Sequence, residues 1–232
     1  MRKSLIITAI LGLFGFNSVR ADIVFVNNLA SSASQVSGVK NSLSTSYYQD
    51  FAPSANGNLN SLIMDLGLQE INNQPPPPTG SYDTMSIYLY SVNGSGAPVT
   101  DLGTLASGLT VSQIESAGTS IGYQNNNDSF IYQYTVNLLN TPSISDANEY
   151  AILVTFSAGT QTIGWAEESG GDPEPAGEVG KLTQLGGGNA VGYGRMELDM
   201  TAVPEASTLT SGVACLGLLI FGQRKWLFRR KS

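Results

Sequence analysis

The stretch 195–201, RMELDMT, decides the fold class of this 232-residue chain. Apolar side chains stand at Met196, Leu198 and Met200, and a polar or charged residue lies on either side of each. Because successive side chains of a β-strand point to opposite faces, this alternation predicts a strand with one apolar face and one polar face. Such strands are typical of antiparallel sheets that expose one face to water.

The same alternation recurs through the middle of the chain. It is found in the stretches 62–68, 85–90, 130–136, 150–156 and 163–165. Glycine and asparagine clusters between these stretches supply turns, and only residues 111–116 suggest a helical turn. We therefore predict that residues 22–202 form an all-β domain, an antiparallel β-sandwich of jelly-roll-like type.

Residues 1–21 have the three parts of a secretory signal peptide. A positively charged start precedes the apolar stretch 5–16, and the small residue Ala21 ends the segment. The apolar stretch is too short to span a membrane, so we expect removal by cleavage between Ala21 and Asp22 rather than anchoring. The sequence therefore predicts export of the domain that follows.

The C-terminal segment predicts one transmembrane helix in the precursor. Residues 209–221 are apolar, and as a helix they would extend about 20 Å, less than the roughly 30 Å hydrocarbon core. Continuation through Phe228 gives about 20 residues and a full crossing. A basic tail should keep the C-terminal side cytoplasmic. It consists of Arg224, Lys225, Arg229, Arg230 and Lys231. A plain single-pass anchor is one interpretation.

A short motif before the apolar stretch favours a second interpretation. The motif consists of Val203, Pro204, Glu205, Ala206 and Ser207. Together with the apolar stretch and the basic tail, it makes residues 203–232 resemble the PEP-CTERM sorting signal, although Ala206 stands where the family usually has Pro. The resemblance implies a Gram-negative bacterium that makes exopolysaccharide. It also implies cleavage by exosortase, a membrane-embedded protease, while the precursor lies in the inner membrane.

Charge and composition exclude several classes of function. Residues 22–203 contain seventeen Asp and Glu against Lys40, Lys181 and Arg195, a net charge of −14, which disfavours nucleic acid as a partner. The chain contains no His, which excludes Ser-His and Cys-His nucleophile systems and the common zinc sites. We therefore expect neither catalytic residues nor a cofactor. A glycosidase that uses two carboxylates is kept as a third hypothesis.

An acidic loop offers the one candidate for a metal site. Glu167, Glu168 and Asp172 lie near further carboxylates among Gly and Pro, and calcium prefers several oxygens on a flexible backbone. Their spacing matches no EF-hand, so a solvated acidic loop is the simpler interpretation, and no metal is expected.

Aromatic residues offer candidates for sugar binding. Tyr88 and Tyr90 alternate with Ile87 and Leu89, so we expect them on the face of their strand that points away from the core. There they could stack on sugar rings. Ordinary sheet packing, in which tyrosine is frequent, is the alternative.

The central part of the chain also resembles the choice-of-anchor domains, especially type R. The residues that carry this resemblance are Gln49-x-Phe51, Leu59-x-Ser61-Leu62, Ile87-x-Leu89-Tyr90 and Glu149-Tyr150-x-Ile152-Leu153. The resemblance implies a surface module without known catalytic residues. We therefore expect an exported protein of the cell surface or exopolysaccharide matrix, with a structural or adhesive role. The alternative is a carbohydrate-binding module that attaches to matrix polysaccharide.

Overall fold

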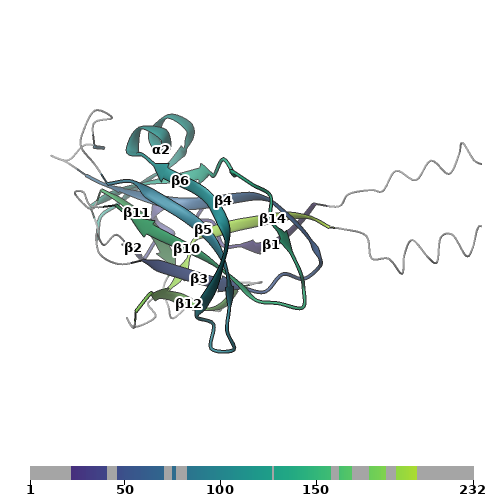
Figure 1. The fold of residues 1–232 in the computed structure, drawn as a ribbon. Helices are drawn as coiled ribbons and strands as arrows, with labels where there is room; N and C mark the ends of the chain where they lie inside the picture. Colours follow the sequence, from purple (N-terminus) through teal and green to yellow (C-terminus); the bar gives the residue numbers. More distant parts are fainter. Residues whose placement is uncertain are drawn as a thin grey trace, which may run out of the picture. The chain divides into compact units, whose positions relative to one another are not determined.

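Two antiparallel β-sheets make up the domain in the computed structural model (Figure 1). The compact unit covers Asp22–Ala202. The structure describes residues 22–40, 46–70, 75–76, 83–126, 128–157, 162–168, 178–186 and 192–202.

The larger sheet has nine strands and is organised around its longest one, β4 (Gly57–Gln69). Its other strands are β1 (Asp22–Asn27), β2 (Gly38–Lys40), β7 (Thr119–Gln124), β8 (Ser129–Thr135), β9 (Ser143–Ile144), β11 (Ile163–Glu168), β13 (Tyr193–Gly194) and β14 (Met196–Ala202). One edge of β4 pairs with β14 and then with β11, and the opposite edge pairs with β8. The edge strand β1 pairs with β14, so that Asp22 lies opposite Thr201.

The smaller sheet has five strands in the order β12-β3-β10-β5-β6. These are β12 (Glu178–Gln184), β3 (Tyr47–Phe51), β10 (Tyr150–Phe156), β5 (Met85–Val92) and β6 (Pro98–Leu109). Helical structure is limited to the short η1 (Ala33–Gln35) and α2 (Val111–Ala117) in the described part of the chain. Thr110 begins α2 with a capping box, in which its hydroxyl accepts from the Gln113 N–H and the Gln113 side chain accepts from the Thr110 N–H.

The inward side chains of both sheets share one core. Met196, Leu198 and Met200 of β14 are all 0% exposed, which confirms the alternation that the sequence shows there. Leu198 lies opposite Leu62 of β4, and the cluster continues into the smaller sheet through residues such as Ile152. The arrangement is consistent with an all-β sandwich, as predicted.

The predicted membrane segment lies outside the described residues, as do the leader 1–21 and the sorting motif. Within the part that the structure describes, no helix is long and apolar enough to cross a membrane.

The shared core predicts a large difference between two leucine substitutions. Leu62→Ala removes a side chain that is 0% exposed and leaves a cavity, so we expect the free energy of unfolding to fall by about 2–5 kcal/mol. Leu139→Ala removes a side chain that is 65% exposed, and the change should stay within about 0.5 kcal/mol. Urea unfolding followed by circular dichroism measures both. Equal losses would contradict the assignment of Leu62 to the core.

Candidate functional site

The outer face of the five-stranded sheet carries a group of tyrosines. Leu153 of β10 lies directly between Tyr48 of β3 and Tyr88 of β5. In the next row of the same face, Ala151 lies between Asp50 and Tyr90. We call this surface, made by Tyr48, Tyr88, Tyr90, Ala151 and Leu153, the tyrosine face.

The tyrosine face is separate from the core. Tyr48, Ala151 and Leu153 are buried and form an apolar cluster of their own, against which Tyr88 and Tyr90 pack while remaining partly exposed. Ile87 and Leu89 point the other way, into the core between the sheets. Both tyrosines that the sequence marks as sugar-stacking candidates therefore lie on the outer face, and a third tyrosine joins them from β3.

A carboxylate borders this face on the β6 side. Asp101 lies opposite Tyr90, and its Oδ1 accepts a hydrogen bond of 2.8 Å from the N–H of Gly103. Gly103 has φ +141°, a conformation that favours glycine, where the pairing of β5 with β6 shifts register. Burial, followed by the charge of Asp101 and by Tyr88, raises the pKa of Tyr90. The Tyr90 phenol therefore stays protonated at neutral pH and keeps its O–H as a donor.

The turn between β5 and β6 reaches over one end of the tyrosine face. Asn93 shapes this turn, because its Oδ1 accepts from the N–H groups of Ser95 and Ala97 at 3.0 and 3.1 Å. Gly96, at φ +77°, approaches β3 so closely that a Cβ would lie 2.6 Å from Oδ2 of Asp50. Glycine is therefore required where the turn meets Asp50.

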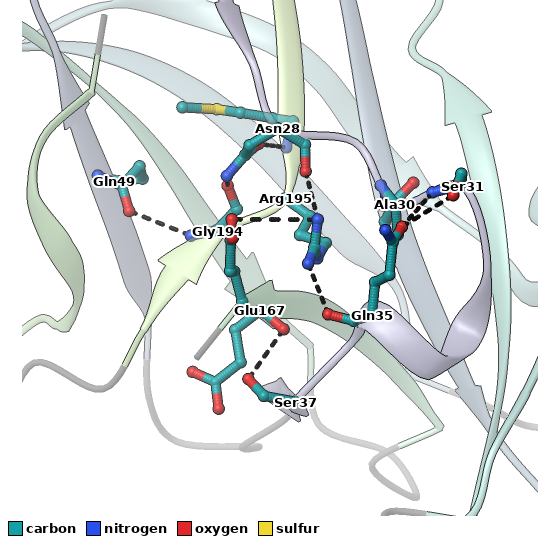
Figure 2. A network of polar contacts seen from close by, with 12 residues as sticks. Asn28, Ala30, Ser31, Gln35, Ser37, Gln49, Glu167, Gly194 and Arg195 are labelled. Carbon is teal, nitrogen blue, oxygen red and sulfur yellow. Dashed lines mark hydrogen bonds and ion pairs between the residues drawn. The ribbon is translucent and has the colours of Figure 1, made fainter. Parts of the chain in front are cut away.

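The nine-stranded sheet differs, because a chain segment covers part of its outer face. Residues 28–36, here called the crossing segment, contain η1 and lead from the end of β1 to the start of β2 (Figure 2). Arg195 holds both ends of the segment: Nη1 donates to the Asn28 carbonyl at 2.7 Å, and Nη2 donates to the Gln35 carbonyl at 2.5 Å. The Asn28 side chain in turn bonds the backbone of Gly194 and Met196 at 3.0 and 2.7 Å.

Asp65 and Gln133 hold the middle of the crossing segment. Oδ2 of Asp65 accepts from the Ala30 N–H at 2.7 Å, and the Gln133 side chain donates to the Ala30 carbonyl at 2.6 Å. Asp65 is 0% exposed. Burial raises its pKa to about 6, although the Ala30 N–H, Arg195 and Gln133 all act in the opposite direction.

Two of the calcium candidates have other partners. Oε1 of Glu167 lies 2.9 Å from Nζ of Lys40, and Oε2 of Glu168 lies 4.0 Å from Nη1 of Arg195. As neighbours on β11, their side chains point to opposite faces of the strand. Asp172 lies outside the described residues, and in the part of the chain that is described no three Cys, Asp or Glu side chains are placed to hold a metal ion.

Comparison with known proteins identifies no relative of this chain. No family model, curated protein or solved structure matches the chain. The sorting motif, the basic tail and Ala21 lie outside the described residues, whereas Asp22 begins β1.

Asp65 makes stability depend on pH in a direction opposite to that of a paired surface carboxylate. Its pKa is 3.8 when unperturbed and about 6 in the folded domain, so ionisation costs the folded state stability as pH rises from about 4 through 6. Asp65→Asn keeps an oxygen for the Ala30 N–H without the charge. We expect the variant to be more stable than the wild type at pH 8 by up to about 3 kcal/mol.

This difference should disappear near pH 3.5, where both side chains are neutral. Urea unfolding of both proteins across this pH range measures it, with Asp146→Asn, at an exposed position, as the matched control. A difference between wild type and Asp65→Asn that does not change with pH would disprove the assignment to Asp65.

Proposed function

We propose that the chain is an exported protein of the cell surface or exopolysaccharide matrix, and that it has a structural or adhesive role by binding polysaccharide on its tyrosine face. The observation that carries this proposal is the presence of Tyr48, Tyr88 and Tyr90 together on one outer face. Aromatic rings offer flat apolar surfaces for the C–H faces of sugars, and phenol groups add directional hydrogen bonds.

The spacing of the tyrosines favours a polymer over a single sugar. Tyr48 and Tyr88 lie on strands separated by β10, so their backbones are about 10 Å apart. Tyr88 and Tyr90 are two residues apart on one strand, about 7 Å. Tyr48 is only 9% exposed and supports the face from below, so contact with different units of one chain falls to the partly exposed rings of Tyr88 and Tyr90. Repeated weak contacts of this kind suit adhesion to a matrix.

The resemblance of residues 203–232 to the PEP-CTERM sorting signal supports the sorting part of the proposal. We infer that residues 203–232 provide a transmembrane helix in the precursor and a cleavage site for exosortase. We also propose that the strands of the two sheets are connected in a jelly-roll-like order.

Loss of the tyrosine rings should weaken polysaccharide binding without unfolding the domain. In a sugar array, we expect Tyr88→Ala and Tyr90→Ala each to weaken binding about fivefold, because each removes about 1 kcal/mol of stacking. Tyr88→Phe keeps the ring and should retain most of the affinity. Val24→Ala, at a residue that is 51% exposed on the other sheet, is the control. No binding of any polysaccharide by the wild-type protein would refute the adhesive mechanism.

Processing predicts a shortened C-terminus on the mature protein. Mass spectrometry of surface material should detect a chain that ends near Pro204-Glu205 in cells with exosortase, and the uncut precursor in cells without it. A C-terminus intact through Ser232 in both strains would show that the segment is a permanent anchor.

A further inference from the structure

None of the basic side chains of the domain lies on β5 or β6, the strands that carry Tyr88, Tyr90 and Asp101. Residues 22–203 contain three of them. Lys40 pairs with Glu167, and Arg195 is 6% exposed beneath the crossing segment. Lys181 lies on β12, has an interaction of its own, and is separated from β6 by three strands. A ligand that contacts Tyr88 and Tyr90 of β5 therefore meets no basic side chain from β5 or from its neighbour β6.

Acidic groups, in contrast, border the face. Asp101 is exposed, lies opposite Tyr90, and is held in place by the N–H of Gly103. The domain as a whole carries a charge of −14, which repels anionic polymers and attracts cationic ones over several ångströms at physiological salt. A cation beside Tyr90 would be attracted both by the Asp101 carboxylate and by the face of the ring.

We propose that the tyrosine face selects polysaccharides with free amino groups, in which an ammonium group binds Asp101 beside Tyr90 while the sugar rings pack on Tyr88 and Tyr90. This rests on the proposed function, because it names the ligand class of the same surface. Exposed carboxylate–ammonium pairs and exposed cation–π contacts are each weak. Together they give a preference of about three- to tenfold for the amino form over its N-acetylated counterpart.

The test compares ligands whose amino groups are either free or N-acetylated. Calorimetric titration of the exported protein with chitosan oligosaccharides and chitin oligosaccharides of equal length, at pH 6, should show tighter binding of the chitosan oligosaccharides. Addition of 0.5 M salt should reduce that preference, since salt screens exposed charges. Alginate oligosaccharides, which are anionic, should bind least.

Asp101→Asn separates the ionic contact from the stacking contact. Its amide oxygen can still accept from the Gly103 N–H, so the bulge keeps its hydrogen bond. We expect the variant to bind both oligosaccharides with the affinity that the wild type has for the N-acetylated form. Asp146→Asn removes one exposed carboxylate elsewhere and should keep the preference. Thermal unfolding monitors the fold of both variants.

The possible failures are distinguishable. Equal affinity of the wild type for both oligosaccharides, a preference for alginate, or a preference that survives Asp101→Asn would overturn the ligand class and leave polysaccharide binding in place. Absence of binding to all three probes, with sugar arrays equally negative, would overturn the proposed function itself.

Discussion

The structure depends on the backbone and side chain of Arg195, where one strand changes partners. Strand β4 pairs with β14 from Gly57 to Met64, which lies opposite Met196. From Leu66 onwards, β4 pairs with β11 instead. The Arg195 carbonyl accepts from the Asp65 N–H and from Nε1 of Trp165, both at 3.1 Å, while its N–H donates to the Ala166 carbonyl at 2.9 Å. Backbone groups at such a fork would otherwise be buried without partners, at a cost of about 1–3 kcal/mol each. The side chain of the same residue then holds the crossing segment.

Charged groups under the crossing segment stabilise the fold by satisfying its backbone. The Arg195 guanidinium donates to the carbonyls of Asn28 and Gln35, and the Ala30 N–H donates to the Asp65 carboxylate. An irregular segment has no ladder of its own, so a sheet that it covers must supply donors and acceptors. The ionised carboxylate is nevertheless costly in a dry site, which is why the pKa of Asp65 rises even beside Arg195. We infer that the network fixes the position of the crossing segment more than it adds to the free energy of unfolding.

Local alternation in the sequence predicts the strands that are themselves uninterrupted, because the extra residues at the register shifts lie in β1, β4 and β6, opposite β14 and β5. Met196, Leu198 and Met200 belong to that group, and so does the outward direction of Tyr88 and Tyr90. Strand β6 was not predicted, because the glycines at positions 103 and 108 have positive φ and interrupt the alternation. The position of Tyr48 beside Leu153 depends on pairing between residues about a hundred positions apart, which local pattern does not contain. Asp65 stands on the polar face of β4 as expected, but burial by a distant segment gives it a different role.

The scarcity of cations links the fold to its surface chemistry. With only three basic side chains in residues 22–203, each one that stabilises the interior is removed from recognition. Arg195 and Lys40 are used in this way, one for the crossing segment and one for Glu167. Carboxylates such as Asp101 are thus left on the surface without a basic neighbour in their own pair of strands. A face built in this way combines apolar rings with negative charge, so the polysaccharide that we propose as its ligand should offer apolar sugar faces and add no negative charge of its own.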